Sequence, residues 1–521
     1  MVKNKFHKLL EVVGFIVVLL LFSLLIIRYY NPFHKDINSD KFVNFDYDAL
    51  TREAQLISKE NESAYSTSVV VLNYHGIDKN TTSGYTISVD EFKEEMFALK
   101  REGYETVGID DLYLFLRGEK QLPEKSFVIT FDDAIKTSYY NTDPILKALD
   151  YRAIMFVIIG SSLEKNSSYY LNEKELKEMQ DSGRWDLQVH TYRGHLREII
   201  DEKNNTGPFY SNKLWLKDEM RIEDNEEYAD RVDNDLKMAK EIMEQRFGRS
   251  MAGFALPFGD FGQRETNYYG SDQIFINLAQ KYYNMVFYQF KPARNKDFRA
   301  NYNNEKKDFY LVMRISAETL ESPDDLIETM NAAQSLSLPY VENFDSKKRW
   351  IAVWGTSLVQ NDYIALRNEA GNSGSMAYLD GSYLWKDYSF SAHIQEAGAR
   401  KIMLTARFQD SENYAACRFE NGSVSIINVR EKIKKVVYEK KYFYQLKDDM
   451  TLSINVFGTD VSCFIDGERV IEGSVLHIPL NGGIAVRTEE FLEGKQLLFD
   501  NIQVNENKIE SLSAVTAKSF V

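Results

Sequence analysis

The hydrophobic and polar positions follow different patterns in the two halves of the chain. From about residue 67 to residue 340, short apolar runs typical of buried parallel strands are separated by stretches with helical spacing. In Val89–Glu102, for example, Phe92, Met96 and Leu99 recur at helical spacing. Strands that alternate with helices predict an α/β fold, either a parallel sheet or a (β/α) barrel.

The individual elements of this first domain can be placed along the sequence. Apolar runs predict strands, and helical spacing predicts helices between them. The charged stretch at 196–245 is expected to be a set of solvated faces without a site. The expected strands are Val69–Asn73, Ser126–Phe131, Ala153–Ile159, Trp185–Val189, Met251–Leu256 and Phe309–Ile315, and the expected helices are Val89–Glu102, Asp110–Leu116, Pro144–Leu149, Glu173–Asp181 and Tyr228–Arg246.

After Pro339 the helical pattern ends and short alternating runs follow. Turn signals such as Asn421-Gly422 and Asp466-Gly467 separate these runs. The pattern predicts an all-β domain over residues 345–506, built as an antiparallel sandwich. The two cysteines of the chain, Cys417 and Cys463, both fall in this domain, where they could form a disulfide or remain two buried thiols.

The N-terminus has the pattern of a membrane anchor. Val12–Ile27 is almost wholly apolar, and lysines precede it. The alternative is a cleaved signal peptide, but no small-x-small cleavage site follows this run. The basic flank places the N-terminus in the cytoplasm and the rest of the chain outside, so the protein is expected at the cell membrane as a single-pass protein. The predicted segments are a cytoplasmic tail at 1–11, a transmembrane signal anchor at 12–30, a tether at 31–66 that could hold a short helix near Ala49–Lys59, a first folded domain at 67–340, a sandwich at 345–506 and a tail at 507–521.

Composition narrows the function classes. The 521 residues are enough for two or three domains, and 44% of them are hydrophobic. The net charge of −15 argues against nucleic acid as a partner, because proteins that bind nucleic acids carry basic patches. With only two cysteines, the chain is not a disulfide-dense scaffold and contains no C-x-x-C zinc motif.

Polar side chains follow four of the predicted strands at their C-terminal ends. His75 follows the first strand, Asp132-Asp133 follows the strand at 126–131, His190 and His195 follow the strand at 185–189, and Asp260 follows the strand at 251–256. Active sites of β/α barrels are built at this end of the strands. Two acids and three imidazoles have the composition of a metal site. His190 and His195 would diverge by about 140° on a helix, so they can share one ion only from a loop.

These stretches resemble the motifs of the polysaccharide deacetylase family, the carbohydrate esterases with the NodB-type distorted (β/α) barrel. T-F-D-D at 130–133 is similar to the first motif, with Ala134 where the family usually has glycine. H-T-Y-x-x-H at 190–195 is similar to the second motif in the spacing of the poly-N-acetylglucosamine deacetylase-like branch. F-A-L-P-F-G-D at 254–260 resembles the third motif, which walls the substrate groove.

The resemblance implies roles for individual residues. Asp132 would be the general base, and Asp133, His190 and His195 would hold a divalent metal, most plausibly zinc, with cobalt, nickel or manganese as alternatives. The substrate-binding residues implied are Pro257, Phe258 and Tyr192, with a backbone donor expected at Phe258. The late L-x-x-H motif, which supplies the general acid in many members, is missing, since Ser316-Ala317-Glu318 stands after the last strand. The acid role would then fall to His75, as in the poly-N-acetylglucosamine branch.

The sandwich resembles concanavalin A-like jelly-roll domains, most clearly at F-I-D-G-E-x-V, residues 464–470. It would either bind glycan through exposed Trp354, Tyr383 and Trp385 or serve as a structural spacer. The expected function is therefore metal-dependent N-deacetylation of an extracellular polysaccharide of N-acetylated amino sugars, such as a biofilm polymer. The alternatives are a peptidoglycan or chitin deacetylase and a non-catalytic glycan-binding membrane protein. Proteins of exopolysaccharide synthesis or export are candidate partners.

Overall fold

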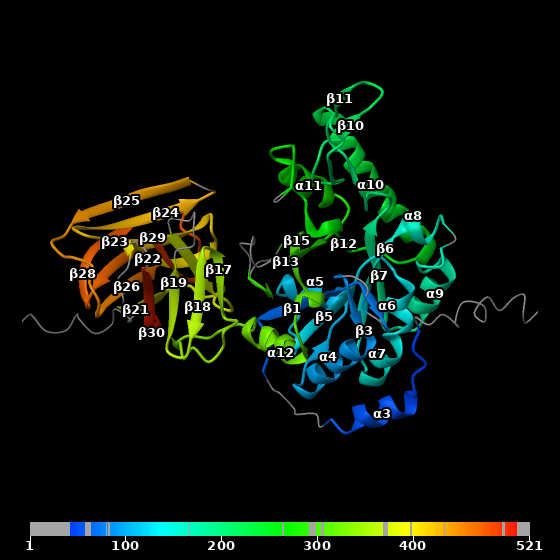
Figure 1. The fold of residues 1–521 in the computed structure, drawn as a ribbon, viewed down its shortest axis with the longest axis horizontal. Coiled ribbons are helices and arrows are strands. Elements are labelled where there is room, and N and C mark those ends of the chain that lie inside the picture. The colour runs from blue at the N-terminus through cyan, green and yellow to red at the C-terminus, as the bar shows by residue number, and fades with distance from the viewer. Residues whose placement is uncertain are drawn as a thin grey trace, which may run out of the picture.

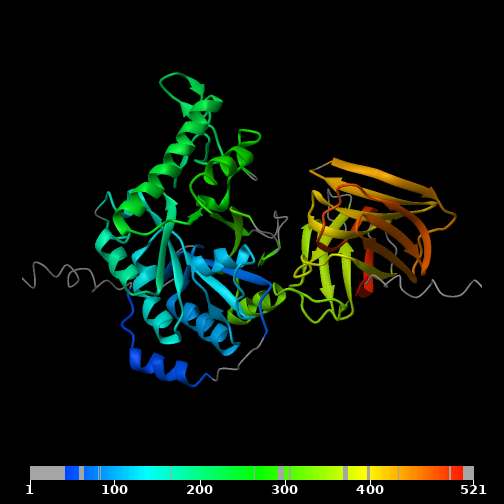
Figure 2. The ribbon, with the colours of Figure 1, turned by 180° about the vertical axis from the view of Figure 1, so that it is seen from behind.

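The computed structural model describes residues 42–57, 64–79, 81, 84–165, 167–262, 265–290, 298–303, 307–367, 374–395, 399–431, 433–491 and 495–507. These residues form a barrel domain and a β-sandwich that lie side by side (Figures 1 and 2). The predicted transmembrane segment at 12–30 lies outside the described residues. In the part of the chain that is described, no helix has both the length and the apolar character needed to cross a membrane.

Seven parallel strands of the described residues close into a barrel. Each strand pairs with the next, and the last, β15, pairs again with the first, β1, through Leu72 and Ile315. The strands, in their order around the barrel, are β1 (Ser68–Tyr74), β5 (Ser126–Phe131), β6 (Ala153–Ile158), β7 (Trp185–Thr191), β12 (Gly253–Ala255), β13 (Met285–Phe290) and β15 (Tyr310–Ser316). The predicted α/β barrel is thus confirmed, although β13 was not predicted.

Helices surround the barrel on its outer side, and four of the ten in the described residues, at 136–140, 159–162, 271–279 and 323–332, were not predicted. The helices are α3 (Tyr47–Gln55), α4 (Val89–Arg101), α5 (Ile109–Leu116), α6 (Lys136–Tyr140), α7 (Asp143–Leu149), α8 (Ile159–Ser162), α9 (Glu173–Asp181), α10 (Asn225–Phe247), α11 (Ser271–Ala279) and α12 (Pro323–Ala332). Helix α10 begins with a capping box between Asp224 and Glu227 and ends at Gly248, whose φ is 65°. Helix α3, from the expected tether, packs against the domain through buried Leu50.

Short elements extend the barrel domain. They are β2 (Gly76–Asp78), β3 (Thr86–Ser88), β4 (Glu105–Thr106), β8 (Arg197–Ile199), β9 (Thr206–Pro208), β10 (Trp215–Leu216), β11 (Arg221–Ile222), β14 (Asn301–Tyr302), and the 3₁₀ turns η1 (Pro257–Gly259) and η2 (Ala317–Thr319). Hairpin β10–β11 stands at the far end of α10, away from the barrel (Figure 1).

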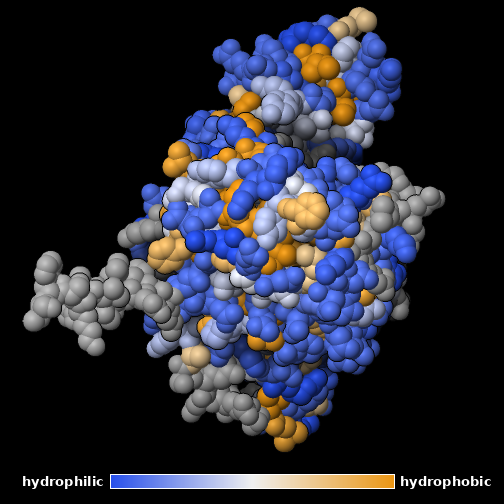
Figure 3. Space-filling model, turned by 90° about the vertical axis from the view of Figure 1, so that its left-hand side faces the viewer, coloured by the Kyte–Doolittle hydropathy of each residue, from blue (hydrophilic) through white to orange (hydrophobic). Residues whose placement is uncertain are grey.

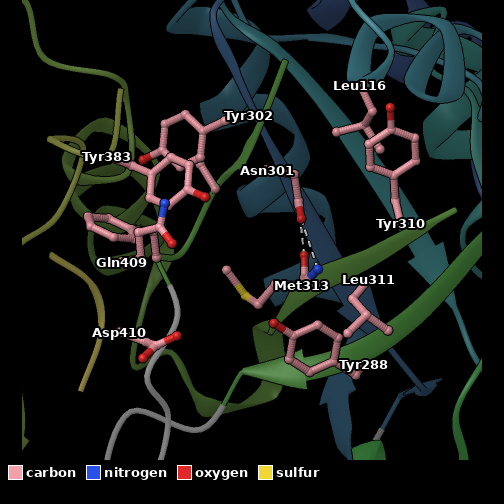
Figure 4. A pocket seen from close by; sticks show the side chains of 12 residues that line it. Leu116, Tyr288, Asn301, Tyr302, Tyr310, Leu311, Met313, Tyr383, Gln409 and Asp410 are labelled. Carbon is pink, nitrogen blue, oxygen red and sulfur yellow. Dashed lines mark hydrogen bonds between the residues drawn. The ribbon is translucent and has the colours of Figure 1, made fainter. Parts of the chain in front are cut away.

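The barrel has a seam where β1 and β15 separate toward their N-terminal ends, and β14 lies at this seam. Strands β1 and β15 pair only near their C-terminal ends, and β14 pairs antiparallel with the start of β1. The Asn301 side chain spans the gap. It donates to the carbonyl of Met313 at 2.9 Å and accepts from the Met313 N–H at 2.9 Å (Figure 4). It also donates to the carbonyl of Val69 at 3.3 Å. One amide side chain thus replaces backbone bonds that the split seam leaves unpaired.

The second domain is a sandwich of two antiparallel sheets, which confirms the predicted all-β fold. One sheet contains β18 (Thr356–Gln360), β19 (Tyr363–Arg367), β30 (Gln496–Glu506), β21 (Tyr388–Gln395), β26 (Met450–Phe457), β27 (Asp460–Ile465) and β28 (Glu468–Ser474), with β16 (Tyr340–Val341) beside β30. The other contains β17 (Trp350–Trp354), β20 (Gly374–Leu379), β29 (Gly483–Phe491), β22 (Ala399–Asp410), β23 (Asn413–Glu420), β24 (Ser423–Arg430) and β25 (Ile433–Lys441). A disulfide between Cys417 and Cys463 joins the two sheets, which decides between the alternatives that the sequence left open.

The barrel and the sandwich meet through the residues around β14. Arg299 forms a buried ion pair with Asp380 at 2.6 Å, and the rings of Tyr302 and Tyr383 stack with centroids 4.9 Å apart. A cavity of about 240 Å³ lies beside this stack (Figure 4). Of the aromatics expected to be exposed for glycan binding, Tyr383 therefore belongs to the junction, and Trp385 is only 4% exposed.

Trp354, the third of these aromatics, is partly buried, with the guanidinium of Arg487 5.2 Å from its ring centroid. The expectation that these three aromatics are exposed was therefore wrong, and glycan binding by the sandwich stays a prediction. Seen from the side of the sandwich, the surface is mostly hydrophilic, with hydrophobic residues in small groups (Figure 3). A hydrophilic surface of this kind agrees with the high proportion of charged residues, 27%.

Candidate active site

The predicted metal-binding residues converge at the C-terminal ends of β5 and β7. The carboxylate oxygen Oδ1 of Asp133 lies 3.4 Å from Nε2 of His190 and 3.3 Å from Nε2 of His195. The three candidate ligand atoms lie within 4.8 Å of one another, and among the described residues this is the group that could hold a metal ion. Asp133 Oδ1 is buried and accepts no hydrogen bond, so this oxygen is available to a cation.

The backbone after β5 adopts an uncommon conformation that presents both acids. Asp133 and Ala134 have φ values of 73° and 57°, in the left-handed region that side chains other than glycine rarely adopt. This conformation explains why glycine commonly follows the paired acids in the family that the motif resembles, and it persists here with alanine. The side chains of consecutive Asp132 and Asp133 can thus point to different partners, Arg314 for Asp132 and the two histidines for Asp133.

His190 is oriented by the adjacent strand. Its Nδ1 donates to the carbonyl of Ala255 in β12 at 2.7 Å, which leaves Nε2 to face Asp133. A hydrogen bond from one ring nitrogen fixes the tautomer and direction of the other, as in most histidine metal ligands. His190 is 1% exposed, so this orientation is held by the protein interior.

The loop that carries His195 is held by Asp235 of α10. The Asp235 carboxylate accepts hydrogen bonds from the hydroxyl of Thr191 at 2.8 Å and from the backbone N–H groups of Tyr192 and Arg193 at 3.1 and 2.8 Å. At Gly194 an added Cβ would lie 2.8 Å from the ring of Phe209, so the chain can pass here only without a side chain. Asp235 is 4% exposed, and the expectation that the charges of this stretch are all solvated was therefore wrong.

Asp132 is held by an arginine that the sequence analysis did not identify. Arg314 of β15 binds it in a bidentate manner, with Nη1–Oδ1 at 2.7 Å and Nη2–Oδ2 at 2.8 Å. Nη1 of Arg314 also donates to Asn73 and Thr130, and both ion-pair partners are buried. Burial raises the pKa of Asp132, but the charge of Arg314 outweighs it and holds this pKa well below its usual range. Asp132 is therefore ionised at neutral pH.

His75 lies between two carboxylates. Its Nδ1 is 2.7 Å from Oε1 of Glu318 in η2, and its Nε2 is 3.8 Å from Oδ2 of Asp132. Burial lowers the pKa of His75, but the hydrogen bond and charge of Glu318 outweigh it, and the pKa rises from 6.5 to about 9. The imidazole is therefore cationic at neutral pH and has a proton to donate.

The predicted substrate-binding residues differ in how they are placed relative to the candidate metal ligands. The ring centroids of Phe258 and His195 lie 5.2 Å apart, so the turn η1 borders the candidate metal ligands. Phe258 has a backbone φ of 60° in this turn. Pro257 is buried in the same turn. The hydroxyl of Tyr192 donates to Glu164 at 2.8 Å, so this side chain is held at the end of α8. The substrate contacts assigned to these three residues stay predictions.

These groups together have the chemistry of a hydrolytic centre. Three donors suited to a divalent ion lie beside an ionised carboxylate and a cationic imidazole, at the end of a parallel barrel where such sites are built. Residues 119–272 match the family model described as polysaccharide deacetylase. This match confirms, for this part of the barrel, the resemblance to the polysaccharide deacetylase family that the motifs indicated.

Similar proteins fit this assignment. The chain is 25% identical over 206 residues to a poly-beta-1,6-N-acetyl-D-glucosamine N-deacetylase of Escherichia coli (strain K12), covering 37% of this chain and 30% of that relative. It is 27% identical over 208 residues to a protein of the same name from Staphylococcus aureus (strain MRSA252), covering 37% and 65%. The chain thus spans less than two thirds of either relative.

A solved structure described as a de-N-acetylase from Aggregatibacter actinomycetemcomitans is 20% identical, with a TM-score of 0.42, and covers 50% of this chain and 98% of its own.

Proposed function

We propose that this protein is a metal-dependent N-deacetylase of an extracellular polysaccharide of N-acetylated amino sugars, with poly-β-1,6-N-acetylglucosamine as its substrate. The observation that carries the proposal is the grouping of Asp133, His190 and His195 beside ionised Asp132 and cationic His75. The names of the relatives support the choice of polymer. Peptidoglycan and chitin carry the same acetamide group and are the competing substrates.

The residues present fit a divalent ion. One carboxylate and two imidazoles are a ligand set that zinc prefers, and three protein ligands leave positions open, as in catalytic sites. Asp133, His190 and His195 would hold the ion, and Ala255 and Asp235 would hold the second and third of these ligands in place. When bound, a divalent ion polarises a carbonyl oxygen and makes nearby water more acidic.

Asp132 and His75 divide the proton transfers between them. Asp132 accepts the proton of the attacking water, because Arg314 keeps it in the ionised form. His75 gives its Nε2 proton to the nitrogen that leaves, since an amide nitrogen departs poorly unless it is protonated. The two groups lie 3.8 Å apart, so both can reach one acetamide. The products are acetate and a free amine on the polymer.

The location of the enzyme is part of the proposal. Lys3, Lys5 and Lys8 before an apolar segment support an N-terminal anchor with the barrel outside the cell. Protease added to intact cells is then expected to release an active fragment that begins between Asn31 and Ser66. Protection of the barrel in intact cells would refute an external location. Exopolysaccharide synthesis or export proteins are the partners expected there.

The test is acetate release by the purified full chain in detergent from a panel of polymers. We expect acetate from poly-β-1,6-N-acetylglucosamine and much less from chitin or peptidoglycan. His195→Ala is expected to lower both bound metal and rate, while His393→Ala, in the sandwich, serves as a control that changes neither. Release from peptidoglycan alone would reassign the substrate. Full metal occupancy in His195→Ala would remove this residue from the ligands.

A further inference from the structure

The cavity beside the stacked rings of Tyr302 and Tyr383 is separate from the candidate active site. Its volume is about 240 Å³, and the residues that line it come from both the barrel and the sandwich (Figure 4). Leu311, which lines the cavity, is 38% exposed, so the cavity reaches solvent at this residue. Open cavities at the junction of two domains are common places for small ligands to bind.

The cavity forms where the helical layer around the barrel is interrupted. Phe287 of β13 and Val312 of β15 face the barrel interior, so the alternation of the strands turns Tyr288 and Met313 outward. Between these two strands the described residues contain β14 and no helix. The sandwich lies on this side of the barrel (Figure 1). The outward side chains of β13 and β15 therefore border a cavity that the sandwich leaves partly open.

The walls of the cavity combine aromatic rings with polar groups. Figure 4 shows stacked Tyr302 and Tyr383, with Gln409 and Asp410, on one side of the cavity and Tyr288 on the other. Each tyrosine offers an apolar ring and a polar end, which suits a surface that meets both apolar and polar groups of a ligand. A pyranose sugar has this character, with C–H groups on the faces of its ring and hydroxyl groups around its edge.

The two polar side chains on the sandwich side are held in place by their own neighbours. Nε2 of Gln409 donates to the carbonyl of Asn481 at 3.2 Å. The carboxylate of Asp410 accepts from the N–H of Glu412 at 2.7 Å and from the amide of Asn413 at 3.0 Å. The side chains that border the cavity on this side are thus fixed before a ligand arrives, which lowers the entropic cost of binding.

We propose that this cavity is a second saccharide-binding site, which holds one amino-sugar unit of the polymer away from the point of hydrolysis. The inference takes its ligand from the proposed function, because the polymer is the saccharide that the barrel is proposed to process. The aromatic rings of the cavity pack against the sugar ring, and Gln409 and Asp410 face its polar edge. N-acetylated units and cationic deacetylated units share this ring, so experiments with each form identify the source.

The cavity and the candidate metal ligands lie at different levels of the barrel. The metal ligands stand at the C-terminal ends of the strands, whereas Leu311 is near the start of β15. At about 3.3 Å per residue, Leu311 lies roughly 16 Å from Ser316 along the strand. An oligosaccharide of several units can span this distance, but a disaccharide cannot. The second site would therefore act on long chains only.

The first test measures binding to the full chain in detergent by isothermal titration calorimetry. The probes are a β-1,6-linked hexamer of N-acetylglucosamine and the same hexamer after complete deacetylation, and the chain carries His75→Ala so that turnover does not change the probe. Leu311→Trp, which fills the cavity, is compared with Leu358→Trp in β18, a control whose leucine is 39% exposed. We expect Leu311→Trp to lose one hexamer-binding site per chain and Leu358→Trp to keep the wild-type number.

The second test measures deacetylation in the chain that retains His75. A hexamer that occupies both sites gains effective concentration at the active site, so Leu311→Trp is expected to raise the KM for the hexamer on the order of 10-fold. The kcat for the hexamer and the KM for the disaccharide are expected to stay unchanged. Gln409→Ala, which leaves the barrel intact, is expected to weaken hexamer binding about 5- to 10-fold and decides the matter if Leu311→Trp lowers the melting temperature.

The outcomes separate this site from the proposed function. A wild-type number of binding sites together with an unchanged hexamer KM in both cavity variants would overturn the second site, and so would a loss that Leu358→Trp shares. Loss of the N-acetylated hexamer supports a site for substrate units, and loss of the deacetylated hexamer supports a site for product units. A wild-type protein that releases no acetate from any polymer would overturn the proposed function instead. The number of hexamer sites in Leu311→Trp would still decide whether the cavity binds sugar.

Discussion

The ion pair between Arg299 and Asp380 joins the barrel to the sandwich, and its removal tests whether the two domains depend on each other. The guanidinium Nε lies 2.6 Å from Oδ2 of Asp380, and its Nη2 donates to the carbonyl of Lys348. The side chains are 6% and 0% exposed. We therefore choose Asp380→Ala, which leaves the guanidinium buried with only carbonyl acceptors.

The magnitude follows from this burial. Unit charges about 4 Å apart attract by roughly 4 kcal/mol at an effective dielectric constant of 20. Water cannot replace the lost carboxylate, so stranding the charge is expected to cost about 3–5 kcal/mol of unfolding free energy. Asp380→Asn keeps an acceptor for Nε and is expected to cost less. Replacing both partners, as in Arg299→Met with Asp380→Leu, is expected to be nearly neutral, because no buried charge is left.

The same variant is expected to affect the active site from a distance. Arg299 stands two residues before Asn301, which clamps the backbone of Met313. The next residue, Arg314, holds Asp132. Loosening the segment at Arg299 should therefore weaken the orientation of Asp132, and we expect a lower deacetylation rate in the folded variant.

The assay combines urea unfolding, followed by tryptophan fluorescence, with acetate release. The matched control is Glu472→Ala, which breaks a pair with Arg469 whose side chains are 58% and 49% exposed and should cost at most about 1 kcal/mol. Stability of Asp380→Ala within about 1 kcal/mol of wild type would refute the estimate for the buried pair. A destabilised variant with the full wild-type rate would refute the link to Asp132.

Further predictions concern single features of the two domains. Asp235→Ala is expected to weaken zinc binding about 10- to 100-fold, measured by competition with a chelator, because the loop carrying His195 loses its support; unchanged affinity would contradict this role. Removing the disulfide by the Cys417→Ser, Cys463→Ser double substitution is expected to cost about 2–5 kcal/mol in unfolding, and reductant should destabilise the wild type but not the variant. The pKa of His75 is raised to about 9, so protonation of His75 should add to the unfolding free energy of the metal-free protein. This contribution should be fully present below about pH 6.5 and should be lost as the pH rises through 9, as measured by urea unfolding at several pH values. His75→Ala should not show that loss.

The strand-end residues could be predicted from the sequence because each motif is local. Asp132 and Asp133 are adjacent, and His190 and His195 lie in one loop, so short-range patterns reveal them. Arg314 and Glu318 contact residues 182 and 243 positions away, and only the closure of the barrel brings them there. A signal for Arg314 was nevertheless present, because an arginine inside an apolar strand needs a buried partner.

The seam and the junction could not be predicted for a related reason. Segment β14 is two residues long and has no hydrophobic period of its own, and its role depends on the place where β1 and β15 separate. Asp235 was missed because α10 is rich in charge, and the pattern does not tell which acid faces the loop at 191–194. In the sandwich, turn signals and alternation predicted the strands, but not which aromatics would be covered by the barrel.

The charges around the site also explain why a weak acid and a weak base suit this chemistry. Arg314 lowers the pKa of Asp132, and Glu318 raises that of His75, so each group is held in its reactive form at neutral pH but transfers protons with less driving force. In the proposed reaction, the loss of driving force is small for His75. The nitrogen that His75 protonates becomes an amine, and that amine is itself mostly cationic at neutral pH. The loss of driving force is larger for Asp132, and a divalent ion held by Asp133, His190 and His195 would offset it by making nearby water more acidic. The ion pair between Arg314 and Asp132 therefore supports the metal dependence that we propose.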